Sequence, residues 1–298
     1  MAEIGLMFPQ MRMDFAAMEE RVCTAEEAGL ASIWLMDHMG PPAAWDQPSF
    51  EAWTTATWLA ARTSSIRIGH LVLCDAFRHP ALLAKMATTL DHASNGRLDL
   101  GIGWGSVPAE IKAWGYTDAG AVARSRRLAE SLAVMRALWE SGGEPVNHHG
   151  ELFDLRDVVQ VPAPVQSPLP VLIGGGGETL TLPLVERWAQ WWNCPAYSAD
   201  RLEPMIARLK SARPDLRISL QIPIGLARTA AQVDEVRALT ERRFGFWGQW
   251  AAGTPDDVAT RLAGLADLGV DLFIVQLHDF ATADSIALLA GAVAPAVR

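Results

Sequence analysis

Short apolar runs alternate with longer amphipathic segments along the whole 298-residue chain. The runs are rich in Val, Ile and Leu, which is typical of parallel strands buried on both faces. The intervening segments carry apolar residues at helical spacing, as Phe15, Met18 and Val22 do. The predicted strands cover residues 4–8, 32–36, 66–74, 97–102, 171–173, 191–194, 218–227 and 271–277. The predicted helices cover residues 14–28, 50–63, 80–93, 122–141, 179–189, 200–212 and 282–297, with two more beginning near residues 230 and 255.

Residues 91–105 contain the end of one predicted helix and the strand that directly follows it. Asn95 and Gly96 tolerate the left-handed conformation that closes a helix. The strand that follows runs into Gly101, Gly103 and Gly105, and glycines at a strand end let a ligand or another backbone come close. Only this glycine end is expected to reach a functional site. We expect structural roles for Asp91, His92 and Arg97.

Strict alternation of eight strands with helices predicts parallel pairing. Eight such repeats in this length fit a (β/α)8 TIM barrel better than an open, doubly wound sheet. No shift in composition marks a linker, so residues 1–298 are expected to form one domain. Residues 142–170, which contain Gly, Pro and a His-His pair, interrupt the alternation of strands and helices. We interpret them as an insertion between the fourth helix and the fifth strand, with a small extra strand at residues 152–155.

Composition excludes several classes of partner. Half of the residues are hydrophobic, and the net charge of −9 comes without runs of like charge, which argues against nucleic acid as the main partner. No apolar run approaches the roughly 18–20 residues that span a bilayer, and the N-terminus lacks the features of a secretion signal. The three cysteines are odd in number and widely spaced. We expect a cytoplasmic protein that acts on small molecules.

In TIM barrels the active site lies where strands end and the following loops begin, and this rule selects candidate residues. His38 is the best acid/base candidate, because only imidazole titrates near neutrality without a large shift. Asp37 beside it would bind a ring nitrogen or cap the turn. The alternative for His38 is a hydrogen-bonded structural residue. The adjacent His148 and His149 share no helix face with a carboxylate, so no metal site is expected.

The most specific local signal is the run Gly174-Gly175-Gly176-Gly177, which follows a strand and precedes a helix expected to begin near Glu178. Bare backbone N–H groups in such a loop bind phosphate. The alternative is a flexible turn, but four consecutive glycines exceed what a turn needs. The run matches neither the Walker nor the dinucleotide-binding pattern.

Two further strand ends carry candidates. Cys74 and Asp75 follow the third strand; a small buried apolar role is favoured for Cys74 over a nucleophilic one, which would need a base. Gly103 leaves room for the flat face of a ligand after the fourth strand, and Trp104 would wall an apolar substrate pocket.

Several segments together resemble the bacterial luciferase-like superfamily, and within it the branch of oxidoreductases that depend on the deazaflavin coenzyme F420. The resemblance runs over nearly the whole chain, and the order of the motifs is more specific than any one of them. The segments are Gly29–Met39, Phe77–Lys85, Leu90–Arg97, Ile173–Glu178, Trp188–Asn193, Gly253–Val258 and Gly269–Ile274.

The resemblance implies a TIM-like barrel with an insertion, often dimeric, and a flavin or deazaflavin across the C-terminal ends of the strands. It implies that His38 lies beside the reactive ring, with Asp37 adjacent. Cys74 and Asp75 would fall at a bulge where members often have a non-proline cis peptide that supports the ring. Gly174–Gly177 would hold the cofactor phosphate. Glu178, the last residue of this motif, would also bind the cofactor.

One departure affects the expected reaction. Some members carry a carboxylate directly after the fourth strand as a proton donor, where this chain has Trp104, with Glu110 further on. This leaves the second acid/base residue open. The first hypothesis is hydride transfer between coenzyme F420 and a small organic substrate. The alternatives are an FMN-dependent monooxygenase that receives reduced flavin from a separate reductase, and a non-catalytic ligand-binding barrel.

Overall fold

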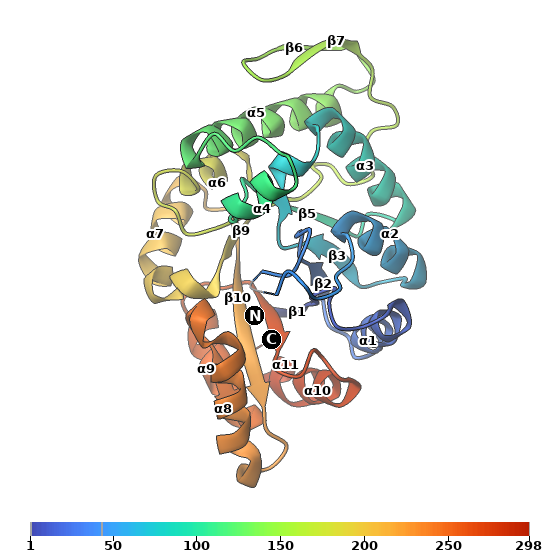
Figure 1. Cartoon of the computed structure of the whole chain (residues 1–298). Helices are drawn as coiled ribbons and strands as arrows, with labels where there is room; N and C mark the ends of the chain where they lie inside the picture. Colours follow the sequence, from blue (N-terminus) through green and yellow to red (C-terminus); the bar gives the residue numbers. More distant parts are fainter. Residues whose placement is uncertain (1, 43, 298) are drawn as a thin grey trace.

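The chain forms a closed ring of eight parallel strands surrounded by helices (Figure 1). The computed structural model describes residues 2–42 and 44–297. Pairing of the last ring strand with the first, with Glu3 opposite Leu272, closes the ring, so the predicted (β/α)8 TIM barrel is confirmed. In ring order the strands are β1 (Glu3–Met7), β2 (Ser32–Leu35), β3 (Arg67–His70), β5 (Leu98–Gly103), β8 (Val171–Gly174), β9 (Trp191–Cys194), β10 (Arg217–Leu226) and β12 (Leu272–Leu277).

Helices cover the outside of the ring (Figure 1). Alternate strand residues face opposite ways, as the two-residue period of a strand requires. In β2, Ile33 and Leu35 pack toward the helices, whereas Trp34 joins a smaller apolar cluster with Met7 and Met36. The helices are α1 (Phe15–Glu27), α2 (Ala52–Arg62), α3 (Pro80–Ala93), α4 (Pro108–Ala113), α5 (Ala121–Glu140), α6 (Leu182–Trp188), α7 (Leu202–Ala212), α8 (Val233–Phe244), α9 (Pro255–Ala266), α10 (Ala283–Leu288) and α11 (Ala294–Val297).

The predicted insertion between α5 and β8 contains a hairpin of two antiparallel strands, β6 (Val146–His149) and β7 (Asp154–Val158). The sequence predicted a single small strand in this segment. The hairpin projects beyond α5 at the top of Figure 1. The rest of the insertion returns along α3, where Lys85 Nζ donates to the Val161 carbonyl at 2.9 Å. The insertion therefore packs on the helices and leaves the ring uninterrupted.

The junction between α3 and β5 has the predicted left-handed residues, with φ of 55° at Asn95 and 76° at Gly96. Arg97, only 8% exposed, donates from its guanidinium to the backbone carbonyls of Ala60, Thr63, Ile66 and Ser94. Asp91 accepts two hydrogen bonds from Gln166. Both side chains therefore hold connections together at the end of the barrel opposite the strand C-termini.

Several elements differ from the prediction. The third strand is divided into β3 and β4 (Leu73–Cys74), which both pair with β5, around a cis peptide between Leu71 and Val72. The helix after the glycine run begins at Leu182, because the N–H groups of Thr181 and Leu182 both bond to the Gly177 carbonyl in an extra turn. The last predicted helix contains a π-helical turn between α10 and α11. A short strand, β11 (Ala251–Gly253), also pairs with β10 beside the ring.

None of the helices in the described ranges combines the length and the apolar character that crossing a membrane requires.

Candidate active site

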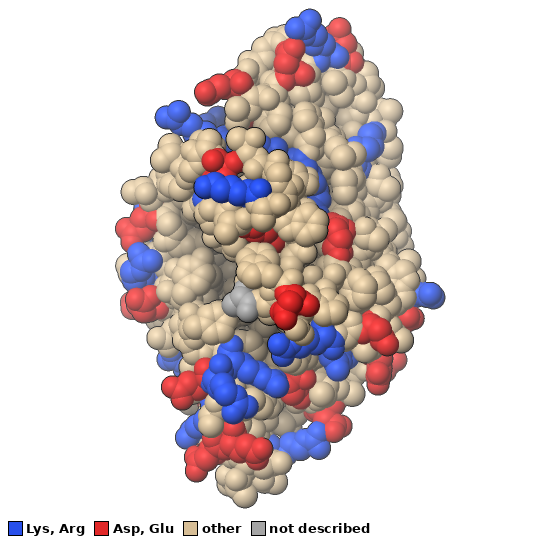
Figure 2. Space-filling view, in the orientation of Figure 1, with Lys and Arg blue, Asp and Glu red and all other residues tan. Residues whose placement is uncertain are grey.

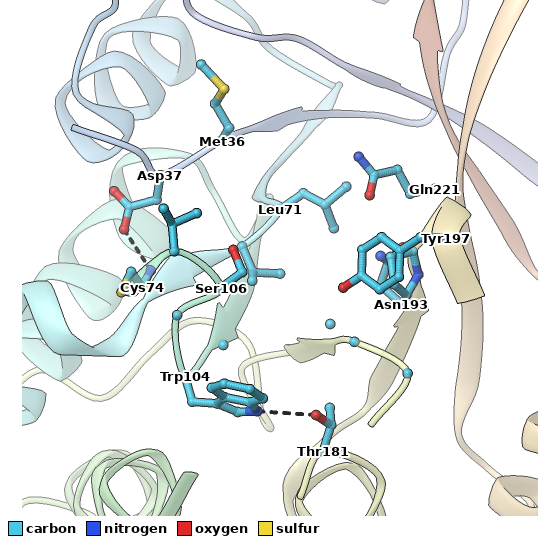
Figure 3. Close-up of a pocket in the computed structure, with 18 of the residues that line it drawn as sticks. Met36, Asp37, Leu71, Cys74, Trp104, Ser106, Thr181, Asn193, Tyr197 and Gln221 are labelled. Atoms are coloured by element: carbon cyan, nitrogen blue, oxygen red, sulfur yellow. Dashed lines mark hydrogen bonds between the residues drawn. The ribbon is translucent and has the colours of Figure 1, made fainter. Parts of the chain in front are cut away.

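A cavity of about 540 Å³ opens at the C-terminal ends of the ring strands. Figure 3 shows side chains from several separate loops turned toward one space. Two predicted residues, Asp75 and Glu178, are not part of its lining. The predicted residues that do line it are Asp37, His38, Cys74, Gly103, Trp104 and Gly174–Gly177.

The inner wall of the cavity is largely apolar. Met7, Met36, Leu71 and Val72 supply it, and Gln221 adds an amide whose Nε2 lies 3.0 Å from Met7 Sδ. The cis peptide joins Leu71 to Val72, three residues before the Cys74 position that the resemblance suggested. A flat apolar ligand therefore has a wall of matching character.

His38 follows β2 and meets a carboxylate from a distant loop. Its Nδ1 lies 2.9 Å from Glu110 Oε2, and Glu110 Oε1 accepts from the Met39 N–H at 2.5 Å. The His38 side chain is 21% exposed, whereas Glu110 is only 3% exposed. A carboxylate only accepts, so Nδ1 carries the hydrogen in this contact. Nε2 is then the nitrogen free to exchange a proton with a ligand.

The carboxylate of Asp37 forms its hydrogen bonds with other groups of the protein. It receives two guanidinium bonds from Arg78, at 2.7 and 2.9 Å, and the Cys74 N–H at 2.8 Å, as Figure 3 shows for Cys74. Arg78 also reaches Glu51 at 2.6 Å. The loops after β2 and β4 are joined by this network, which holds His38 and Cys74 at fixed positions on the cavity.

Replacing Asp37 with asparagine is expected to lower the free energy of unfolding by about 2–3 kcal/mol, because a buried charge-assisted pair loses one partner. Cofactor affinity should change far less, since the carboxylate faces Arg78. Chemical denaturation and cofactor titration measure the two effects. Asp215→Asn removes a matched but exposed partner of Arg213 and should leave the unfolding midpoint unchanged. Equal midpoints for wild type and Asp37→Asn would contradict the structural role.

Cys74 and Asp75 face different surroundings. Burial raises the pKa of the Cys74 thiol to about 12, so it stays neutral and is no nucleophile at physiological pH. This supports the small buried role favoured from the sequence. Asp75 forms an ion pair with Arg127 of α5, away from the cavity. Asp75 thus connects the loop to the helix layer.

The glycine run lines the cavity directly after β8. Gly175 has a φ of 125°, which side-chain-bearing residues rarely adopt. A Cβ at Gly176 would lie 2.4 Å from Ser198 Oγ, and one at Gly177 would lie 3.0 Å from Thr181 Oγ1. Bare backbone and two hydroxyls therefore border one corner of the cavity.

One cation lies beside this corner. Arg201 lines the cavity, and its Nη1 lies 2.8 Å from Glu178 Oε1. The Glu178 side chain is 57% exposed and partly neutralises Arg201. Contact of Glu178 with a cofactor stays a prediction, whereas Arg201 is a residue that the sequence did not single out.

Trp104 closes the cavity beside the glycine run. Its Nε1 donates to Thr181 Oγ1 at 3.2 Å, a contact drawn in Figure 3. The guanidinium of Arg124 lies 5.3 Å from the centre of its ring, within the range of a cation–π contact. Trp104 is therefore held in one position in the cavity wall, and its contact with a substrate stays a prediction.

The residue that sequence reasoning left unassigned is Glu110. It was visible six residues after Trp104, but only the fold of α4 brings it to His38. Ser198 and Thr181 carried no signal of their own, because hydroxyl residues are common in loops. Arg78 stands in a segment of the resemblance, Phe77–Lys85, and its partner Asp37 became evident only from the structure.

The order of motifs, the ring and this cavity agree with a sequence comparison. The profile of the luciferase-like monooxygenase family matches residues 2–246. The chain belongs to this family. Membership of the luciferase-like family confirms the resemblance inferred from the motifs.

Related sequences of the luciferase-like family include enzymes of two kinds. An F420-dependent glucose-6-phosphate dehydrogenase of Amycolatopsis mediterranei (strain U-32) is 36% identical over 174 residues, which is 57% of this chain and 49% of the relative. A 4-hydroxyprotoasukamycin monooxygenase of Streptomyces nodosus subsp. asukaensis is 28% identical over 246 residues, 77% of this chain and 64% of the relative. The matched part thus spans about half of the first relative.

Solved structures show the same fold. An F420-dependent secondary alcohol dehydrogenase in complex with an F420–acetone adduct superimposes with a TM-score of 0.84 at 20% identity, covering 100% of this chain and 99% of the other. The FMN-bound oxygenating constituent of 3,6-diketocamphane monooxygenase, from a plasmid of Pseudomonas putida, gives 0.82 at 21% identity, with the same coverage. Proteins bound to either cofactor therefore share this fold.

Proposed function

We propose that this chain is an oxidoreductase that exchanges hydride between coenzyme F420 and a small organic substrate. The observation that carries the proposal is the His38–Glu110 pair, which lines an apolar cavity together with the glycine run. Hydride transfer to or from a carbonyl or hydroxyl group requires a partner that moves a proton. His38 Nε2 meets that need. The F420-dependent dehydrogenase among the sequence relatives supports this choice of cofactor.

The cavity fits a tricyclic ring that carries a phosphate arm. The apolar wall around Leu71 and Val72 suits the flat ring, and at Gly174–Gly177 backbone without side chains lines the cavity beside Ser198 and Thr181. Ser198, Thr181 and Arg201 would bind the phosphate together with the bare backbone N–H groups. Hydride exchange at its ring is the chemistry that the cofactor supplies when bound.

Residues of the chain would transfer the proton, stabilise the charge that this creates and exclude water. Glu110 orients the imidazole of His38 and compensates the positive charge that forms when Nε2 takes a proton. In the direction of oxidation, Nε2 accepts the proton of a substrate hydroxyl; in the direction of reduction, it returns one. Trp104 and the apolar wall exclude water from the reacting group.

The second candidate is an FMN-dependent monooxygenase that uses oxygen and reduced flavin, supplied by a separate reductase. The monooxygenase relatives favour it, and both cofactors share the ring and the ribityl phosphate. A barrel without catalysis is the third candidate. The convergence of Asp37, His38 and the glycine run on one cavity argues against it.

We also propose a cellular compartment and an oligomeric state for the enzyme. Cys23, Cys74 and Cys194 are free thiols, which suits a reducing cytoplasm. A homodimer is proposed by analogy with the superfamily.

Cofactor choice is tested by titrating the purified chain with oxidised coenzyme F420 and with FMN and following fluorescence quenching. F420 should bind more tightly. Tight FMN binding without any response to F420 would reject the first candidate. In the same assay, Gly176→Ala should weaken either cofactor about tenfold or more, or about 1.4 kcal/mol, because a Cβ there would displace the Ser198 hydroxyl proposed to bind the phosphate. Gly264→Ala, which meets nothing within 4 Å, is the matched control. Unchanged affinity in Gly176→Ala would remove the glycine run from the site.

A further inference from the structure

Three arginines gather beside the cavity without carboxylate partners. Arg12 follows β1, and Arg242 and Arg243 end α8; we call them the arginine cluster. Among residues 2–42 and 44–297, no carboxylate lies within ion-pair distance of any of the three. Twelve other arginines do form ion pairs: Arg62, Arg67, Arg78, Arg124, Arg127, Arg136, Arg156, Arg201, Arg208, Arg213, Arg217 and Arg228.

A phenyl ring brings two of these arginines together. The guanidinium of Arg12 lies 5.8 Å from the ring centre of Phe280, and that of Arg243 lies 5.2 Å from it. Arg243 also donates to the carbonyl of His278 at the end of β12. Burial, together with the charges of Arg242 and Arg12, lowers the pKa of Arg243.

The acidic group that acts on Arg243 is already engaged. Asp279 influences Arg243 electrostatically but forms no ion pair with it. Its carboxylate instead accepts from the Ala281 N–H at 3.2 Å and from the hydroxyls of Thr282 and Ser285 at 2.6 and 2.7 Å. The arginine cluster therefore retains guanidinium donors for another anion.

The arginine cluster is not part of the cavity lining, but residues close to it in sequence line the cavity or pack against its wall. Trp247, four residues after Arg243, lines the cavity and contacts the rings of Phe244 and Phe246. On the other side, Met11 precedes Arg12 and packs against the apolar cluster of the cavity wall. In Figure 2, blue side chains gather along the lower edge of the hollow, near the place where Figure 1 shows the end of α8.

We infer that the substrate carries a carboxylate or phosphate on an apolar body, with the anionic group bound by the arginine cluster and the body against the rings of Trp247, which lines the cavity, and the exposed Phe246. Planar guanidinium groups bind carboxylate and phosphate oxygens with paired hydrogen bonds. The adjoining aromatic rings offer apolar area to the rest of the molecule. The inference rests on the proposed function, because it names the substrate class of the same site.

The acidic tail of coenzyme F420 offers the same chemistry from another source. That tail follows the cofactor phosphate, and the glycine run proposed for the phosphate follows β8. Arg12 follows β1, which lies across the ring from β8 in the strand order, whereas Arg242 and Arg243 end α8, which follows β10. The position of Arg12 therefore favours the substrate as the source of the anion.

The test measures binding to the full chain by isothermal titration calorimetry without cofactor. The probes are 3-phenylpropionate, benzyl phosphate and the neutral 3-phenylpropionamide. The wild type should bind at least one anion about tenfold more tightly than the amide, and added salt should reduce the difference. Arg12→Gln and Arg243→Gln should each remove most of this preference while binding of the amide stays the same. Arg156→Gln on the distant hairpin makes the same charge change and should preserve the preference.

Two results would overturn the inference. The first is an absence of preference for either anion in the wild type, including the case in which no probe binds. The second is a preference that survives in both Arg12→Gln and Arg243→Gln, whose folding is checked by circular dichroism. A parallel F420 titration separates the sources: variants that lose F420 affinity but keep the anion preference assign the arginine cluster to the cofactor tail. Because the probes need no cofactor, failure of the wild type to bind F420 would count against the proposed function alone.

Discussion

Replacing His38 with alanine is expected to lower turnover about 10²–10⁴-fold, the range that a positioned acid/base group contributes. Cofactor affinity should stay within about threefold, because His38 is one of many residues around a large apolar wall. The physical reason is the loss of Nε2, which is the nitrogen of the His38–Glu110 pair that can exchange a proton. Steady-state kinetics give turnover, and fluorescence titration gives the cofactor affinity.

Two companion variants sharpen this result. Glu110→Gln keeps a group that can contact Nδ1 but removes the charge that stabilises the imidazolium, so its turnover should fall less than that of His38→Ala and its pH–rate profile should shift. His149→Ala removes an exposed histidine of the hairpin, paired with Asp154, and should have no effect. Unchanged turnover in His38→Ala would refute its role in proton transfer.

Gly101→Ala is expected to cost about 3 kcal/mol of stability or more, at the upper end of the overpacking range. A Cβ at this position would lie 1.7 Å from the backbone carbonyl oxygen of His70 on the neighbouring strand β3. Backbone in the ring cannot turn aside as a flexible side chain can. The β3–β5 contact would have to open, and the variant should unfold at much lower denaturant concentration or fail to accumulate.

The same substitution elsewhere in the chain should have the opposite sign. Gly264 lies within α9, and a Cβ there would meet no atom within 4 Å. Gly264→Ala is therefore expected to stabilise the protein by about 0.5–1 kcal/mol, since glycine is unfavourable inside a helix. Chemical denaturation of the two variants side by side compares these effects. Similar unfolding midpoints for both would show that the Gly101 contact relaxes at little cost.

The ring was predictable because its signals are local. Buried parallel strands read as apolar runs, and the end of α3 is marked by Asn95 and Gly96, whose backbone adopts the expected left-handed form. The division of residues 66–74 into two strands was not predictable from its pattern. Leu71 and Val72 are as apolar as their neighbours, so hydrophobicity carries no information about a bend between them.

The candidate site was predictable only in part, because its contacts join loops that are distant in sequence. The position rule for barrel loops found His38, Trp104 and the glycine run. It could not find Glu110, which lies 72 residues from His38 and reaches it through the course of α4. The arginine cluster was missed for the same reason, since Arg12 and Arg243 become neighbours only when β12 closes the ring against β1.

Ring closure also brings the two described ends of the chain together. The Ala2 N–H donates to the Val297 carbonyl at 2.8 Å, beside the pairing of β1 with β12. A short peptide could link these ends, and new ends could be opened at the exposed tip of the β6–β7 hairpin, around residues 150–152. Such a circular permutant would keep every ring strand and every cavity residue. The linear order of this chain is thus one of several that could encode the same barrel.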